Sequence, residues 1–275
     1  MNAVLSAEAQ TRASLVLVRW MSQLDPQNGL LPKGRAAEDR VWDYADTGAD
    51  LFPHLLIAAT LLEPRDAPAL TRIIDTEQAI SSTQGLPSNI NLNTDKPEKQ
   101  NLEDRVYGSV EYAKDGLLPL LERLGPGPWS DRMLDIARRV DAAEPQSTRF
   151  GSIPSDSSEV NGQALQILSR AYWLTRDDEL ARSGARLTRA YLDLALPSTG
   201  MIPGRTWDFD RERGNTQQAQ LRDHGNEIVA GLVEFHLVES ALAIPEIMER
   251  RQDIHDMLGA LLKLGRTKEG LWKSA

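Results

Sequence analysis

The sequence predicts an all-α protein built from an array of helical hairpins, and three observations lead to this prediction. Pairs of segments carry apolar residues at helical spacing and are joined by short polar stretches. A glycine, one or two large apolar residues and often a proline recur along the chain, which is typical of helix ends. Strand patterns are almost absent, and only brief extended pieces near these glycines are expected.

The predicted array begins with one opening helix and continues with four hairpins. Within each hairpin the joint is too short for anything except an antiparallel return of the second helix. The hairpin helices are expected at residues 50–62 with 67–80, 112–124 with 130–140, 165–174 with 180–194, and 226–242 with 247–264.

Glycines mark the predicted ends of the array's repeating parts. A glycine can adopt the positive φ that closes a helix, and a proline shortly after it prevents the helix from continuing. The Gly116–Pro119 string has the same letters but lies inside a helical pattern, so it is not counted as an end. The predicted helix ends are at Gly29, Gly85, Gly200 and Gly270, with a weaker copy at Gly151.

The connections between hairpins are long, polar and rich in aromatic residues. Long loops that add no core usually carry binding groups. If the hairpins stand side by side, all these connections emerge at the same end of the array, which is the expected functional face. No Pro/Gly/Ser-rich linker divides the chain, so one domain over residues 1–275 is predicted.

Composition excludes several classes of protein. The net charge of -9 gives no basic surface for nucleic acid, and the longest apolar stretches, such as Leu55–Leu62, are too short to cross a membrane. The chain has no cysteine and no metal-ligand or nucleotide motif, so neither a metal nor a cofactor is expected. A soluble protein without a visible signal peptide is predicted, with its location and oligomeric state left open.

The sequence resembles the six-hairpin glycosidases, whose fold is an (α/α)6 toroid. The strings that carry this resemblance are Asn161–Ala164 with Ala171–Asp177, the Thr199–Pro203 helix end, Trp42–Tyr44, Trp207–Phe209 and Asp223–Gly225. The resemblance implies a toroid-like ring of hairpins acting on carbohydrate. A complete ring has six hairpins and only four are predicted here, so we expect an incomplete ring that lacks C-terminal hairpins.

Acidic residues recur where the long connections enter the next helix. Asp46 and Asp223 occupy equivalent positions, and they are the expected catalytic carboxyl pair, with Glu111 and Glu159 as substitutes. Glycosidic hydrolysis needs two such groups, one acting as acid and one as base or nucleophile. Which residue is acid and which is base stays open. The alternative is structural, because acids at helix starts also cap the helix.

Further residues of the long connections are expected to bind the substrate. A sugar ring can stack on exposed aromatic side chains, and arginines can pair with the carboxylate of a uronic acid. The structural alternatives are that the aromatic side chains anchor their loops and that the arginines form internal salt bridges. The expected substrate-binding residues are Trp42, Asp43, Tyr44, Arg105, Tyr107, Arg205, Trp207, Asp208, His224 and Glu227.

Three functions follow from these observations. The leading hypothesis is a glycoside hydrolase acting on an oligosaccharide or polysaccharide through carboxylate acid/base chemistry. The second keeps the fold but makes the protein a uronic-acid lyase or a sugar epimerase, in which Tyr107 or His224 removes a proton. The third is a helical-repeat binding scaffold without catalysis.

Overall fold

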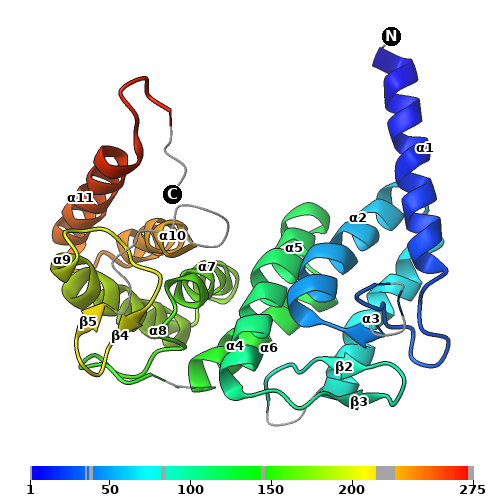
Figure 1. Ribbon diagram of the computed structural model, residues 1–275, viewed down its shortest axis with the longest axis horizontal. Coiled ribbons are helices and arrows are strands. Elements are labelled where there is room, and N and C mark those ends of the chain that lie inside the picture. Colours follow the sequence, from blue (N-terminus) through cyan, green and yellow to red (C-terminus); the bar gives the residue numbers. More distant parts are fainter. Residues whose placement is uncertain are drawn as a thin grey trace. The chain divides into compact units, whose positions relative to one another are not determined.

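The computed structural model describes residues 2–34, 36, 40–81, 85–143, 146–214 and 227–271. Over these residues the chain is helical apart from connecting loops and five two-residue strands, so the predicted all-α class is confirmed. The chain divides into two compact units, unit 1 with residues 1–139 and unit 2 with residues 140–275 (Figure 1). The single domain predicted over residues 1–275 stays a prediction.

Unit 1 consists of one helix, two helical hairpins and a small sheet (Figure 1). Both predicted hairpins are confirmed, although the first helix of each begins earlier than expected. The elements in chain order are α1 (Asn2–Met21), β1 (Val41–Trp42), a π-helical turn (Tyr44–Leu51), α2 (Phe52–Leu62), α3 (Ala67–Ser81), β2 (Ile90–Asn91), β3 (Lys96–Pro97), α4 (Leu102–Glu111), a π-helical turn (Tyr112–Leu117), α5 (Leu118–Leu124) and α6 (Pro128–Ala143). The last turn of α6 enters unit 2.

Unit 2 contains the other two predicted hairpins, which are also confirmed (Figure 1). Between them lies a long connection with a two-stranded antiparallel ribbon. The elements in chain order are α7 (Ser158–Thr175), α8 (Asp178–Arg189), a π-helical turn (Ala190–Ala195), α9 (Leu196–Ser198), β4 (Trp207–Asp208), β5 (Arg213–Gly214), α10 (Glu227–Leu242) and α11 (Ile247–Gly265).

The predicted glycine positions have the backbone conformation that ends a helix or turns a loop. Gly29, Gly85, Gly200 and Gly270 have φ values of 75°, 98°, 67° and 85°, and Gly151 has 114°. Only glycine adopts this left-handed region without a steric penalty. The recurring glycine is therefore a conformational requirement of the fold.

Three of the long helices contain a π-helical turn, and one residue separates each turn from a proline. Pro53, Pro119 and Pro197 are the second residues of α2, α5 and α9. A proline inside an α-helix lacks the N–H donor and its ring clashes with the carbonyl four residues earlier. The amide of the residue before each proline instead donates to the carbonyl oxygen five residues earlier, as the Phe52 amide does to the Thr47 carbonyl oxygen. The wider turn lets the helix continue past the proline.

Helices from successive hairpins approach closely at pairs of glycines. In unit 2 an added Cβ on Gly162 would lie 2.2 Å from the backbone of Glu227, and one on Gly231 would lie 2.4 Å from the Gly162 carbonyl oxygen. In unit 1 a Cβ on Gly116 would lie 2.6 Å from the Gly48 carbonyl oxygen. Gly162 of α7 contacts Glu227 of α10, and Leu165, further along α7, contacts Gly231, further along α10. The two helices therefore run parallel. This is the local arrangement of inner helices in an α/α array.

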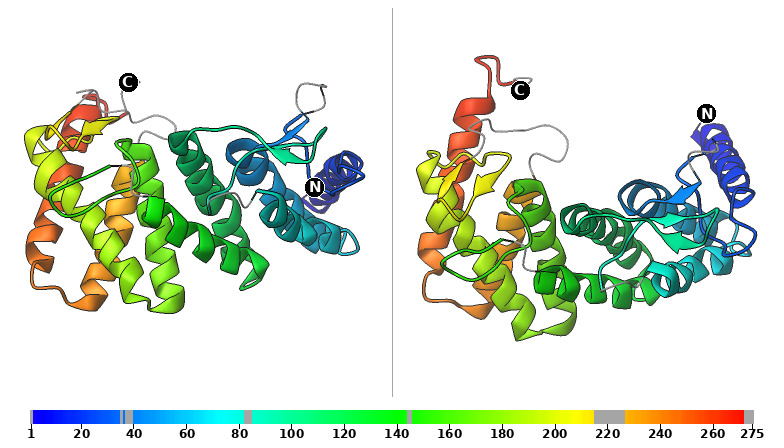
Figure 2. Two further views of the ribbon diagram at one scale, coloured as in Figure 1. Left: turned by 90° about the horizontal axis from the view of Figure 1, so that it is seen from below. Right: turned by 60° about the horizontal axis from the view of Figure 1, so that its bottom comes forward.

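Within each unit the long connections meet at one end of the helices. In unit 1, β1 pairs with β2, which joins the connection before the first hairpin to the connection after it. In unit 2, Ser157 of the connection before α7 forms a bridge with Thr206 of the connection before α10. Figure 2 shows the short α10–α11 joint at the opposite end of unit 2 from β4 and β5. The predicted gathering of loops is therefore observed inside each unit.

Candidate functional site

Asp43 and Asp46 lie where the connection of unit 1 enters its first hairpin. Asp43 caps the helix, because its Oδ1 accepts the amide of Asp46 at 2.9 Å. Its Oδ2 accepts Asn89 Nδ2 at 3.2 Å and lies 3.6 Å from Lys33 Nζ. Asp46 is exposed and forms a close ion pair with the same lysine. These contacts raise the pKa of Lys33, chiefly through its hydrogen bond to Asp46.

The expected catalytic partner of Asp46 cannot be placed beside it. Asp223 and His224 lie outside the described residues. The carboxylate of Asp46 is paired with Lys33 in this structure. Asp46 as a catalytic residue therefore stays a prediction.

Trp42 and Tyr44 differ from the expectation of exposed loop aromatics. Their side chains are 0% and 1% exposed, and they pack edge to face with each other and with Tyr112. The Tyr44 hydroxyl donates to Glu77 Oε2 at 2.6 Å. The reason is hydrophobic: the strand and the start of the helix place both rings inside unit 1, where they form part of the core. Neither ring offers a face to a sugar in this structure.

The remaining predicted residues of unit 1 lie on α4. Arg105 and Tyr107 are half-buried in its first two turns, and Arg105 Nη2 lies 3.4 Å from the Leu86 carbonyl oxygen. Glu111 was expected at a helix start, but it ends α4 and is 3% exposed. The helix begins ten residues earlier because Asn101 caps it through the amide of Asp104.

The start of α7 in unit 2 brings together segments from two connections. The amide of Ser158 donates to the Arg205 carbonyl oxygen, and the amide of Trp207 donates to the Asp156 carbonyl oxygen, both at 2.9 Å. The Arg205 side chain is exposed beside this junction, and Trp207 is 4% exposed. The predicted residues of strand β4 are thus fixed by backbone hydrogen bonds against the N-terminus of α7.

Asp156 and Asp208 form a pair of carboxyl groups with different surroundings at this junction. Burial raises the pKa of Asp156, and the charge of Asp208 raises it further. Asp208 accepts the amide of Arg211 at 3.0 Å, and its Oδ2 lies 3.5 Å from the Arg211 Nη1. Asp156 forms no ion pair with any residue that the structure describes. The two carboxyl groups therefore differ in burial and in their charged neighbours.

Glu159 and Glu227 occupy the first turns of the two parallel helices, as predicted for the entry into inner helices. Both are half-buried. The Glu227 carboxylate accepts Gln166 Nε2 at 2.6 Å, which connects the start of α10 to the third turn of α7. Unit 2 therefore brings five predicted residues to one end of its helices, namely Glu159, Arg205, Trp207, Asp208 and Glu227.

A buried hydroxyl network lies behind the Asp156–Asp208 pair. The Tyr191 hydroxyl accepts Asn161 Nδ2 at 3.0 Å and donates to Ser158 Oγ at 3.3 Å. Burial raises the pKa of Tyr191 to about 12. A tyrosine that serves as a base needs a lowered pKa, so Tyr191 acts here as a neutral hydrogen-bonding group.

Sequence reasoning missed Asp156. The signal was the Pro154–Ser157 string just ahead of the predicted helix, where a short polar stretch follows a glycine turn. Only the fold reveals its neighbour, because Asp208 is 52 positions away and reaches it through the pairing of two connections.

Two negative findings apply to the described part of the chain. No three His, Cys, Asp or Glu side chains gather there as a set of metal ligands. No helix within the described ranges has the length and apolar character needed to span a membrane.

Comparisons with known proteins give distant structural likeness only. No protein-family model matches the chain, and neither does any curated protein. Among solved structures, the cellobiose 2-epimerase from Spirochaeta thermophila is similar to it at 13% sequence identity, over 97% of this chain and 88% of that chain, with a TM-score of 0.34. A likeness this distant assigns neither an activity nor a substrate to this chain.

Proposed function

We propose that unit 2 carries the active site of a carbohydrate-active enzyme, in which Asp156 and Asp208 act as acid and base. The observation that supports this proposal is the unequal environment of the two carboxyl groups. Asp156 is partly buried with no cation beside it in the described chain, whereas Asp208 has the guanidinium of Arg211. Separating the protonation states of two neighbouring carboxyl groups is the usual way to obtain both catalytic roles at one pH.

The saccharide substrate is inferred from the resemblance to six-hairpin glycosidases. The strings Asn161–Ala164 and Trp207–Phe209, which carry that resemblance, border the Asp156–Asp208 pair. We propose hydrolysis of a glycosidic bond as the reaction. Asp156 would protonate the leaving oxygen, and Asp208 would activate a water molecule or attack the anomeric carbon. Glu159 and Glu227 are the further carboxylates at this end of unit 2.

The test is to compare Asp156→Asn and Asp208→Asn with Asp210→Asn on a panel of oligosaccharides. Asp210 is an exposed acid of the same ribbon and serves as the matched control. Because general acid/base catalysis contributes about 100-fold to 10,000-fold, both site variants should lose at least about 100-fold in the rate of reducing-end release. The control should keep its rate, and all three proteins should stay within about 1 kcal/mol of wild-type stability. Equal rates for all three variants would refute the proposal.

Epimerisation, the reaction named for the similar Spirochaeta protein, is the second candidate. One carboxylate can remove a proton from the carbon next to a sugar carbonyl while a carboxylic acid returns a proton to the opposite face. This reaction creates no new reducing ends and incorporates deuterium from D2O into the sugar. Nuclear magnetic resonance of the products therefore distinguishes epimerisation from hydrolysis on the same samples.

A further inference from the structure

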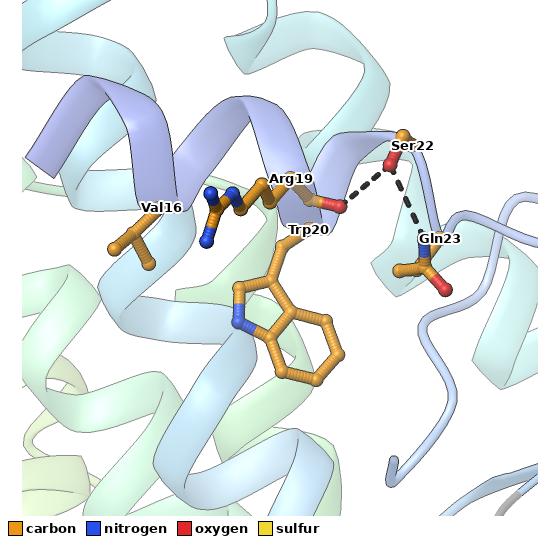
Figure 3. A pocket seen from close by; sticks show the side chains of 5 residues that line it. All are labelled: Val16, Arg19, Trp20, Ser22 and Gln23. Atoms are coloured by element: carbon orange, nitrogen blue, oxygen red, sulfur yellow. Dashed lines mark hydrogen bonds between the residues drawn. The ribbon is translucent and has the colours of Figure 1, made fainter. Parts of the chain in front are cut away.

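A cavity of about 550 Å³ lies against the C-terminal part of α1 in unit 1 (Figure 3). Small-molecule sites usually have volumes of roughly 300–1,000 Å³, so this one has the size of a ligand site. Among the described residues its lining consists of Val16, Arg19, Trp20, Ser22 and Gln23. Val16, Arg19 and Trp20 follow the spacing i, i+3 and i+4, so they share one face of the helix.

The cavity combines an aromatic ring with a cation. Figure 3 shows the indole of Trp20 and the guanidinium group of Arg19 extending from adjacent positions on α1. Trp20 is half-buried, and Arg19 is exposed. An indole presents a flat apolar face and an N–H donor, whereas a guanidinium group offers a planar set of donors that matches a carboxylate.

Arg19 has no carboxylate partner among the described residues, although the chain contains 40 acidic residues and carries a net charge of -9. On the same helix, Arg12 pairs with Glu8 four positions earlier. Arg19 has Leu15 at the corresponding position, so its helix supplies no such acid. An exposed cation at the edge of a cavity is available to an anionic ligand.

The polar edge of the cavity is held in place by short-range hydrogen bonds. Ser22 Oγ donates to the Arg19 carbonyl oxygen at 2.7 Å, and Gln23 Nε2 donates to Ser22 Oγ at 3.2 Å (Figure 3). These bonds connect the Gln23 amide to the end of α1 through Ser22. The cavity therefore has one apolar face, one positive charge and a neutral amide on its rim.

We propose that this cavity binds a uronic-acid residue of a saccharide, with the pyranose ring stacked on Trp20 and the carboxylate paired with Arg19. An indole face and a guanidinium group together fit a ring that bears a carboxylate, and the choice of a saccharide rests on the proposed function. The described lining contributes an indole, a guanidinium group, an amide and a hydroxyl group, so we propose a binding subsite.

The experiment titrates the intact protein with digalacturonic acid, with a neutral galactose disaccharide and with benzoate, and follows binding by calorimetry. The variants are Trp20→Ala and Arg19→Gln. The matched control is Trp173→Ala, because Trp173 is an exposed tryptophan with the guanidinium group of Arg176 4.4 Å from its ring centroid. We expect the wild type to prefer the acidic over the neutral disaccharide by about tenfold or more, and each site variant to weaken binding of digalacturonic acid by about tenfold, while the control binds as the wild type does.

Three results would overturn the proposal: no binding by the wild type, binding that both site variants retain, or binding of benzoate in place of the sugar. Asp156→Asn separates this proposal from the proposed function, since it should lose turnover and keep the binding of digalacturonic acid. Trp20→Ala should keep the turnover of a neutral oligosaccharide substrate and lose the binding of digalacturonic acid. Binding without any turnover by the wild type would refute the enzyme and support the subsite.

Discussion

Glu239 is a carboxyl group buried in unit 2 without a cation of its own. It is 2% exposed, its Oε2 has no hydrogen-bond partner among the described residues, and His236 Nδ1 lies 3.9 Å away. Arg250 is near, but its guanidinium is paired with Asp193. Burial therefore raises the pKa of Glu239 to about 7.

This raised pKa predicts that unit 2 loses stability as the pH rises. The folded state binds the proton of Glu239 more tightly than the unfolded state, whose pKa is near 4.5. Stability falls between these two values and levels off above about pH 7, with a total change of about 3 kcal/mol. Glu239→Gln mimics the neutral form, so it should match the wild type at pH 4 and be more stable at pH 8.

Chemical denaturation of both proteins across this pH range measures the effect. His236 titrates with the opposite sign, because burial lowers its pKa and its protonation destabilises the fold. The difference between wild type and Glu239→Gln removes most of that contribution. A difference that does not change between pH 4 and pH 8 would contradict the assignment.

Glu77 and Arg132 form a buried ion pair in unit 1. Arg132 donates to both carboxylate oxygens of Glu77, at 2.7 Å and 2.9 Å. The Arg132 side chain is 4% exposed and the Glu77 side chain is 0% exposed. Removing one partner leaves an uncompensated buried charge, so Glu77→Leu should cost about 3–5 kcal/mol in the free energy of unfolding. The double variant Glu77→Leu/Arg132→Met should recover a large part of that loss in urea unfolding. A double variant as unstable as the single one would show that shape, not charge, governs this position.

The contact between α7 and α10 depends on two glycines, and their substitution gives a prediction at the scale of the element. A Cβ on Gly162 or Gly231 meets backbone atoms at 2.2 Å and 2.4 Å, which no side-chain rotation relieves. Gly162→Ala and Gly231→Ala should each destabilise by about 3 kcal/mol or more, since the helices have to move apart.

Gly259 is the matched control for these substitutions. It lies inside α11, and a Cβ there has no described neighbour within 4 Å. Gly259→Ala should raise stability by about 0.5–1 kcal/mol, because alanine is the better helix former. Similar effects at all three positions in thermal unfolding would contradict the close approach of α7 and α10.

The helices were predictable from sequence because their signals are local. Apolar periodicity, short joints and positive-φ glycines place all four hairpins, with α7 and α8 at Ser158–Thr175 and Asp178–Arg189. The π-helical turns were not predicted, although apolar periodicity extended the predicted helices through Pro53 and Pro119. Periodicity shows that a helix continues, but not how its backbone accommodates a proline.

The candidate site was only partly predictable, because it depends on burial and on pairing between distant segments. The strings around Trp207 and Glu227 led to the end of the unit 2 helices where the connections meet. Trp42 and Tyr44 were expected to be exposed but are buried. The sequence of a polar stretch does not show whether an aromatic side chain within it faces solvent or packs into the core. Asp156 was missed because its partner Asp208 becomes its neighbour only when the connections pair.

At the scale of the whole molecule, the two compact units can unfold either together or separately. The sequence predicts one domain, and a single cooperative domain would lose its protection against amide exchange everywhere at once. The structure gives units 1–139 and 140–275, each with its own set of packed hairpins. Helix α6 contributes to both units, since its residues 128–143 include the boundary.

We therefore expect Gly162→Ala to reduce amide protection in α7, α8, α10 and α11 while α2–α5 keep wild-type exchange rates. The altered glycine contacts α10 in unit 2, and each unit can retain its own buried core when the other opens. Hydrogen exchange followed by mass spectrometry resolves the two sets of helices in one experiment, and Glu77→Leu supplies the reciprocal disturbance in unit 1. If either variant lowers protection equally in both sets, the 275 residues unfold as one cooperative domain and the division into units has no energetic meaning.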